Sequence, residues 1–191
     1  MAKAIKIIRN EHAGLAAIYR TLSVVVNDVV EGRTEPSFEL FHSLVDYLKS
    51  FMYRYHHPKE NDYLFPAVIK RNPGAASLVE VLETQHKEGG ALLKTLEQAL
   101  ERYEKEGKTA QQEFVDAFER YHQFEWKHMS MEEREIIPMA KRSLTEEDWE
   151  AIDKVFLDHS DPLFGDKKQE EYKKLFDHIA KVAPAPYGLG S

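Results

Sequence analysis

The sequence predicts an all-α protein, an up-down-up-down four-helix bundle with two additional short C-terminal helices. Apolar residues recur at spacings of three, four and seven through four long stretches, and no stretch alternates as a strand would. Glycine turns interrupt these stretches at Gly32 and Gly107, each with a threonine two residues later. The same order of histidine motifs surrounds each turn, so the chain consists of one helical hairpin used twice.

The first hairpin comprises a helix over residues 4–31 and a second helix that starts near Pro36 and Ser37. Gly32 suits the end of the first helix, and a proline followed by a serine is typical of a helix start. Pro58 would normally end the second helix, because proline removes a backbone donor and clashes with the preceding turn. We expect this helix to continue past Pro58 with a bend.

The second hairpin comprises helices over 76–105 and 110–141, which follow a break at 72–74 and flank Gly107. These four helices define a bundle domain over residues 1–142. Residues 143–191 are expected to form a C-terminal helical extension packed on the bundle. In it, a short helix opens at Thr145 and Asp148, a turn follows at 161–165, and a second short helix spans 168–182 before a tail rich in proline and glycine.

The composition indicates a soluble domain, which we expect in the cytoplasm. Hydrophobic residues make up 42% of the chain and charged residues 31%, and the formal net charge of −7 argues against general nucleic-acid binding. The lack of cysteine excludes disulfides and thiolate metal ligands. The N-terminus lacks the apolar core of a signal peptide, and no apolar run approaches membrane-spanning length.

Two copies of the pattern His-x3-Glu-x5-Pro carry the chemistry, with His56 and Glu60 in the first and His128 and Glu132 in the second. Residues four apart share a helix face, and an imidazole beside a carboxylate suits a borderline divalent metal. A lone histidine precedes each pair on the neighbouring helix, at a similar distance from the glycine turn. A bundle would bring all of them to one metal site: His12, His56, Glu60, His86, His128 and Glu132.

Other polar residues stand near this set. His57 is expected one residue off the ligand face, and His122 is rotated away from His128, so we expect both beside the ligands or at the rim of the site. Glu125 could supply another oxygen ligand or be a solvated or rim glutamate. Ordinary surface or core roles are expected for His42, His159 and His178.

Six protein ligands exceed the needs of one catalytic zinc ion and favour a pair of ions, with Glu60 and Glu132 as the bridges. Six ligands cannot saturate two octahedral ions, so positions would remain for water, dioxygen, peroxide or nitric oxide. Iron is preferred because histidine outnumbers carboxylate, with manganese or zinc as alternatives.

These residues resemble the hemerythrin-like, His-His-Glu cation-binding domain. The resemblance covers roughly residues 4–141 and rests on four motifs in order: Glu11-His12, His56-x3-Glu60, Gln85-His86 and His128-x3-Glu132. Residues 144–165 are similar to an extension found in some bacterial members. The resemblance implies a non-haem di-iron centre with an oxo or hydroxo bridge and two bridging carboxylates. Members of the family bind oxygen, sense oxygen or redox state, handle iron, or respond to nitrosative stress.

The sequence departs from the oxygen-carrying hemerythrins at two positions. Those proteins have a second histidine four residues after the third-helix one, where this chain has Gly90, and their last carboxylate is an aspartate five residues after its histidine, whereas Glu132 follows by four. This chain thus resembles the six-ligand variants of the family, which argues against simple reversible oxygen carriage.

Three functions follow as alternatives. The first is a di-iron module that binds or senses dioxygen, nitric oxide or redox state at an open site. The second is an enzyme that reduces oxygen, peroxide or nitric oxide. Five aromatic residues near the expected height of the site could serve it as redox groups, although core packing is the role that we expect for them: Tyr53, Tyr55, Tyr63, Tyr121 and Trp126. The third is iron storage or delivery, ranked last because the family's repair proteins usually carry cysteine. No nucleic acid or membrane partner is expected, and the C-terminal helices would cover the bundle or mediate a homodimer.

Overall fold

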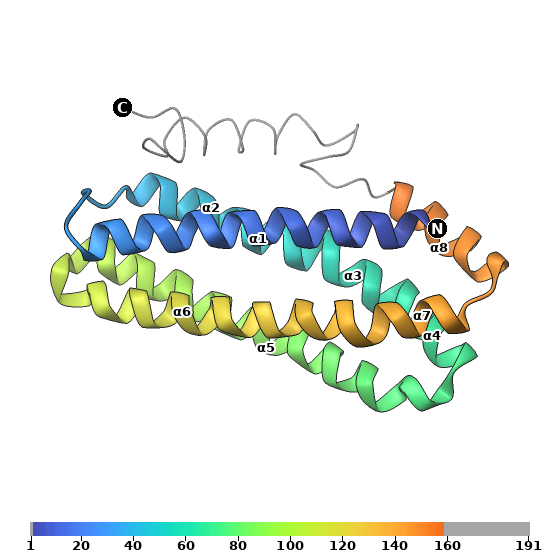
Figure 1. Cartoon of the computed structure of the whole chain (residues 1–191). Helices are drawn as coiled ribbons and strands as arrows, with labels where there is room; N and C mark the ends of the chain where they lie inside the picture. Colours follow the sequence, from blue (N-terminus) through green and yellow to red (C-terminus); the bar gives the residue numbers. More distant parts are fainter. Residues whose placement is uncertain (1, 159–191) are drawn as a thin grey trace.

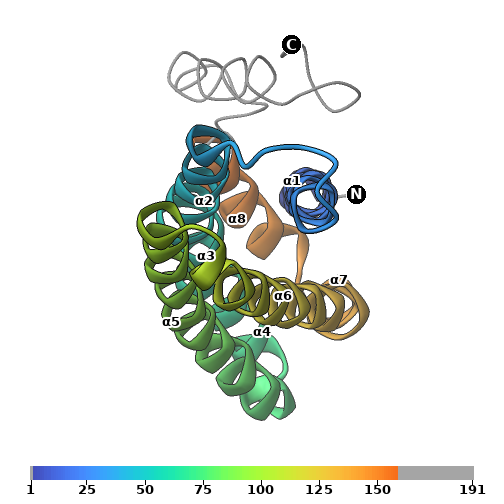
Figure 2. The same ribbon diagram turned by 90° about the vertical axis from the view of Figure 1, so that its left-hand side faces the viewer.

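The computed structural model describes residues 2–158, and within that range all regular structure is helical, with no strand (Figure 1). Four long helical segments lie side by side, each antiparallel to the next along the chain (Figures 1 and 2). They are α1 (Lys3–Val30), a second segment from α2 (Phe38–Phe51) through α3 (His57–Lys59) to α4 (Phe65–Arg71), α5 (Ala76–Glu106), and a fourth from α6 (Lys108–Met131) to α7 (Ile137–Ser143). The predicted all-α four-helix bundle is confirmed.

The helix ends follow the sequence signals. The hydroxyl of Ser37 accepts a hydrogen bond from the Leu40 amide at 3.4 Å, which caps the start of α2. Gly107 alone separates α5 from α6, and its φ of +65° lies in the left-handed region that glycine adopts without steric cost. The two hairpin turns therefore lie where the glycines predicted them.

The second and fourth segments are not plain α-helices. Each contains π-helical turns, in which the backbone hydrogen bonds reach one residue further back than in an α-helix. Two of these turns, Met52–His56 and Glu60–Leu64, flank Pro58, and the third is Glu132–Ile136. The second segment does continue past Pro58, as expected. The turns shift the register of the helix beside the candidate ligands.

The bundle core consists of two apolar clusters separated along its length. One extends towards the glycine turns and includes Leu22, Phe41 and Phe114, and the other lies towards the N-terminus and includes Ile8, Phe65 and Ile137. Along α1, His12 falls between the last residue of one cluster and the first of the other. The candidate metal ligands therefore occupy a polar layer between two dry ones.

Of the C-terminal extension, the structure describes α8 (Glu146–Asp158), which crosses the end of the bundle beside the N-terminus (Figure 1). Thr145 and Asp148 cap it reciprocally, since the Asp148 amide donates to the threonine hydroxyl at 3.3 Å and the Thr145 amide donates to the aspartate at 2.9 Å. Asp153 accepts from the first amides of α1, at 2.7 Å from that of Ala4. The predicted turn at 161–165, the helix over 168–182 and the tail lie outside the described residues.

Helix α1 is long and apolar enough, by length and composition alone, to cross a membrane. The sequence-based expectation that no run approaches this length was therefore wrong. The apolar side chains of α1 are largely those that pack in the core, such as Ile8, Leu15 and Leu22. Packing in the bundle accounts for the apolar composition of this helix.

An exposed ion pair holds the start of α8 against α4. Arg71 donates to both carboxylate oxygens of Asp148, at 2.6 and 3.0 Å, and this contact lowers the pKa of that carboxyl below its ordinary value of 3.8. A lowered pKa in the folded state stabilises the fold above the ordinary pKa, and the contribution disappears as the pH falls through the lowered value. We expect Asp148→Asn to lower the melting temperature at neutral pH, with a difference that vanishes in strong acid. Glu150→Gln, an exposed control on the same helix, should show no such pH-dependent difference.

Candidate metal centre

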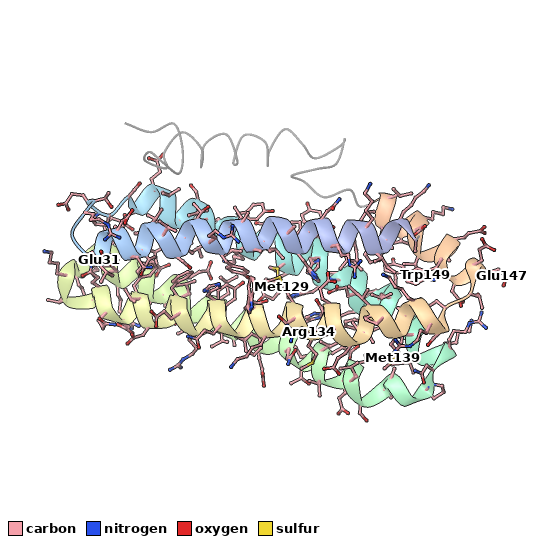
Figure 3. The ribbon with its side chains drawn as sticks, in the orientation of Figure 1. Glu31, Met129, Arg134, Met139, Glu147 and Trp149 are labelled. Atoms are coloured by element: carbon pink, nitrogen blue, oxygen red, sulfur yellow. The ribbon has the colours of Figure 1, made fainter. Side chains whose placement is uncertain are left out.

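Two clusters of metal-ligating side chains lie buried in the polar layer of the bundle. In each cluster, one ligand atom from every residue lies within 4.8 Å of the others. Figure 3 places Met129, the neighbour of His128 in the chain, about half-way along the bundle. The clusters consist of His12, His56, Glu60 and Glu132, and of His57, His86 and His128, none of them more than 7% exposed.

The two glutamates connect the clusters. Glu132 lies 3.1 Å from Nε2 of His12 in the first cluster and 3.2 Å from Nε2 of His128 in the second. Glu60 lies 3.6 Å from Nε2 of both His56 and His86. Carboxylates placed between two groups of imidazoles are suited to bridging two metal ions.

The outward nitrogens of four imidazoles are fixed by acceptors that repeat with the hairpins. Glu11, which precedes His12 in the chain, accepts a hydrogen bond from Nδ1 of His56 at 2.8 Å. Gln85, which precedes His86, accepts one from Nδ1 of His128 at 3.0 Å. The residue after each ligand glutamate holds a lone histidine in the same way, Glu133 for His12 at 3.1 Å and Asn61 for His86 at 2.8 Å. An acceptor at Nδ1 fixes the proton there and leaves Nε2 free as a metal ligand.

Most of the inward atoms, by contrast, have no hydrogen bond, and the exception is the 3.0 Å contact between Nε2 of His86 and Nε2 of His128. Buried polar atoms without a partner concentrate here, and they include Nε2 of His12 and His56, both ring nitrogens of His57, one oxygen of Glu60 and both oxygens of Glu132. Such groups are costly to bury unless something satisfies them. A pair of cations between the clusters would satisfy them, so the residues fit a two-metal centre.

Burial and mutual repulsion perturb the acidic and basic groups of the layer. Burial lowers the pKa of His56 to about 4, against the opposing effect of Glu11. Burial and the neighbouring Glu132 raise the pKa of Glu60, whereas the imidazoles around Glu132 overcome burial and lower the pKa of that carboxyl. Carboxyls and imidazoles whose pKa values are shifted by burial and by one another are typical of a site that holds a cation.

The model of the hemerythrin HHE cation-binding domain matches residues 3–140. The chain belongs to the hemerythrin family. The match begins with α1 and ends within α7, so it covers both ligand clusters of this HHE domain and leaves α8 outside. No curated protein and no solved structure matches the chain.

His57 of this HHE domain lies deeper in the candidate centre than an α-helical period predicts. It was expected off the ligand face, but its side chain is 3% exposed and its ring stacks on that of His86 with centroids 3.8 Å apart. The π-helical turns on either side of Pro58 change the register, so two consecutive histidines of one segment both point inward. His57 thus supplies a third imidazole to the cluster in which Gly90 stands for the histidine of oxygen-carrying hemerythrins.

A buried ion pair lies behind the first cluster. The ammonium of Lys59 donates to Glu11, whose other oxygen accepts from His56, and all three side chains are at most 2% exposed. Lys59 also lies 5.2 Å from the ring centroid of Phe156, a residue of α8. The extension beyond the family match therefore covers the residues that orient a candidate ligand.

The remaining candidates lie around the centre. Glu125 is 1% exposed and fills the space beside Gly89, where an added Cβ would lie 2.4 Å from its carboxylate. His122 is turned away from His128, as expected, but it packs between Tyr19 and Phe118 and belongs to neither cluster. Trp126, expected in the core, is 51% exposed. His42 pairs with Glu104 at the surface, whereas His159 and His178 lie outside the described residues.

Proposed function

We propose that this domain binds a pair of iron ions between the two clusters and takes dioxygen, nitric oxide or peroxide at an open position of that pair. One observation supports it: in a single layer, three buried imidazoles and two carboxylates have atoms without a hydrogen bond, the two remaining imidazoles meet Nε2 to Nε2, and four of the five rings are held at Nδ1. Glu60 and Glu132, which lie near imidazoles of both clusters, would hold the two ions jointly. Manganese or zinc would be the competing occupants.

The two clusters would leave the ions unequally ligated. Three imidazoles would hold the second ion, but only His12 and His56 would hold the first beside the two glutamates, so we assign the open position to the first ion. When bound, an iron pair with an open position supplies reversible ligand binding and electron exchange with that ligand. The apolar clusters on both sides would exclude bulk water and favour a small neutral ligand over larger anions.

The same geometry favours a resident metal over storage or delivery of iron. A protein that releases its cargo needs ligands that solvent or a partner can reach, whereas these are at most 7% exposed and their rings are held by Glu133, Glu11, Asn61 and Gln85. Reduction of oxygen or peroxide is the second candidate function, because the partly buried Tyr53 packs against His57 and the buried pair Tyr19 and Tyr121 lies behind it.

Anaerobic loading with iron(II) tests the proposal. Bound iron is counted, and visible spectra are recorded before and after addition of dioxygen, nitric oxide or hydrogen peroxide. We expect about two irons per chain, as in other di-iron bundles, and new charge-transfer bands on ligation. Bands that reverse on removal of the ligand support a binding or sensing role, and bands that decay with consumption of the ligand support an enzyme. A chain that takes up no iron, manganese or zinc contradicts the proposal.

The role of His57 has a separate test. His57→Ala removes one of three imidazoles from the second cluster, so we expect iron in the variant to fall from about two towards about one per chain. His42→Ala is the matched control, because His42 lies at the surface. Full iron content and an unchanged spectrum in His57→Ala would show that His57 is not a ligand and that the site consists of the six residues predicted from the sequence.

A further inference from the structure

A line of aromatic rings starts at the metal centre. The ring of Tyr53 lies edge-on to that of His57 with centroids 5.2 Å apart. The hydroxyl of Tyr53 adjoins Tyr121 without the geometry of a hydrogen bond, and the hydroxyls of Tyr121 and Tyr19 are hydrogen-bonded at 3.3 Å. Tyr121 and Tyr19 are both fully buried. Three redox-capable phenols therefore lead away from one candidate ligand.

The line continues to the surface. The ring of His122 lies 5.4 Å from that of Tyr19, and Trp126 lies 6.3 Å beyond it, between ring centroids. Trp126 is 51% exposed, which is unusual for a large aromatic side chain that would gain from burial. It lines a surface groove of about 520 Å³ together with His122, Arg20 and Lys127.

We propose that Tyr53, Tyr121, Tyr19 and Trp126, with His122 between the last two, form an electron path from this groove to the metal centre. The inference rests on the proposed function, because it assumes a redox-active metal pair at the inner end. One electron enters at Trp126 from a donor in the groove, and one leaves Tyr53 for a centre oxidised by dioxygen or peroxide. After each passage the donor is oxidised by one electron, the centre is reduced by one, and the four residues are unchanged.

Oxidation of a buried tyrosine also requires a place for its proton. Glu125 provides one, since both of its carboxylate oxygens are buried without a hydrogen bond and the carboxylate lies beside Tyr53 in the space left by Gly89. While the path lacks an electron, one proton rests on Glu125. Tyr121 passes its phenolic proton to Tyr53 together with the electron, and Tyr19 does the same to Tyr121 across their hydrogen bond. When the electron from Trp126 reaches Tyr19, the protons shift back along the same hydroxyls and Glu125 returns the one that it holds. The three tyrosine hydroxyls thus have a proton acceptor, Glu125, at the end nearest the metal centre.

The groove favours an anionic donor. Its lining includes two cations, Arg20 and Lys127, and no acidic residue, on a chain whose net charge is −7. A local positive patch on an acidic protein attracts small anions. Ascorbate, a small anionic one-electron donor, is therefore the probe of choice.

The path is tested first without metal chemistry, on the full chain as purified and after loading with redox-inert zinc. The background carries Trp149→Phe, Tyr55→Phe, Tyr63→Phe, Tyr172→Phe and Tyr187→Phe, so that Trp126 is the only tryptophan and the tyrosines outside the path are reduced to the buried Tyr47 and Tyr103. A flash-activated ruthenium polypyridyl oxidant generates the Trp126 radical, and transient absorption follows its conversion to a tyrosyl radical. We expect a conversion rate independent of protein concentration that falls several-fold in Tyr19→Phe and in Tyr121→Phe. Tyr103→Phe, a buried tyrosine at the glycine-turn end, should leave it unchanged.

A second measurement adds the metal. With bound iron counted beforehand, re-reduction of the peroxide-oxidised centre by ascorbate should slow several-fold in Trp126→Phe and not in Trp149→Phe. No tyrosyl radical in the flash experiment, or the same conversion rate in Tyr19→Phe and Tyr121→Phe, overturns the path whatever the metal content. A normal flash result in a chain that binds no metal would leave the path standing and contradict the proposed function instead.

Discussion

Glu132→Gln should abolish binding of the metal pair rather than weaken one site. Glu132 lies within 3.6 Å of imidazoles from both clusters, and glutamine keeps its size but loses the charge and one ligating oxygen. Loss of a group that only orients a ligand typically costs about 10–100-fold in metal affinity. We expect a larger loss here, measured by competition with a chelator and by metal content after gel filtration.

The matched control is Glu135→Gln, an exposed glutamate in the same π-helical turn, which should bind metal like the unmodified chain. Removal of a buried carboxylate also relieves its repulsion of Glu60, so the metal-free Glu132→Gln protein should remain folded by circular dichroism. Retention of two metals by folded Glu132→Gln would show that this carboxylate does not join the clusters.

Glu11→Gln should destabilise the fold by about 3–5 kcal/mol, the typical cost of removing one partner from a buried ion pair. Glutamine can still accept the hydrogen bond from His56, but it leaves the ammonium of Lys59 buried without a counter-charge. The free energy of unfolding is measured by denaturant titration of metal-free protein.

The double variant Glu11→Gln/Lys59→Met separates charge from shape. Methionine keeps most of the apolar length of lysine against Phe156 without its charge, so most of the lost stability should return. If the double variant is no more stable than Glu11→Gln, the loss comes from the orientation of His56 and not from the unpaired ammonium.

Much of the fold and most of the candidate centre could be predicted from the sequence. The spacing of the apolar residues located the long helices, and the glycines located the turns between them. Gly32 and Gly107 both adopt the positive φ that these turns require. The repeat brought His12, His56, His86 and His128 to one layer, since equal helix lengths on either side of a turn fix their height.

His57 could not be placed in this way. Counting by 3.6 residues assumes that every turn is α-helical, and the turns at Met52–His56 and Glu60–Leu64 break that assumption within a few residues of it. That limit does not apply to Trp126, because α6 is α-helical throughout and its buried residues Phe118, Tyr121 and Glu125 define a face on which Trp126 does not lie. The hydrogen-bond acceptors of the imidazoles, by contrast, could have been predicted from the sequence, because they occupy matching places in the two repeats: Glu11 and Gln85, and Asn61 and Glu133.

The π-helical turns also make the length of this chain adjustable at defined points. A π turn contains one residue more than an α turn while the helix on either side keeps its direction. A chain one residue shorter at 52–56 could therefore keep both flanking helices, and both apolar clusters, in place. What such a deletion would change is which side chains face the interior at that turn. Among related sequences, single-residue gaps at these turns would mark a change in the ligand set rather than a change of fold.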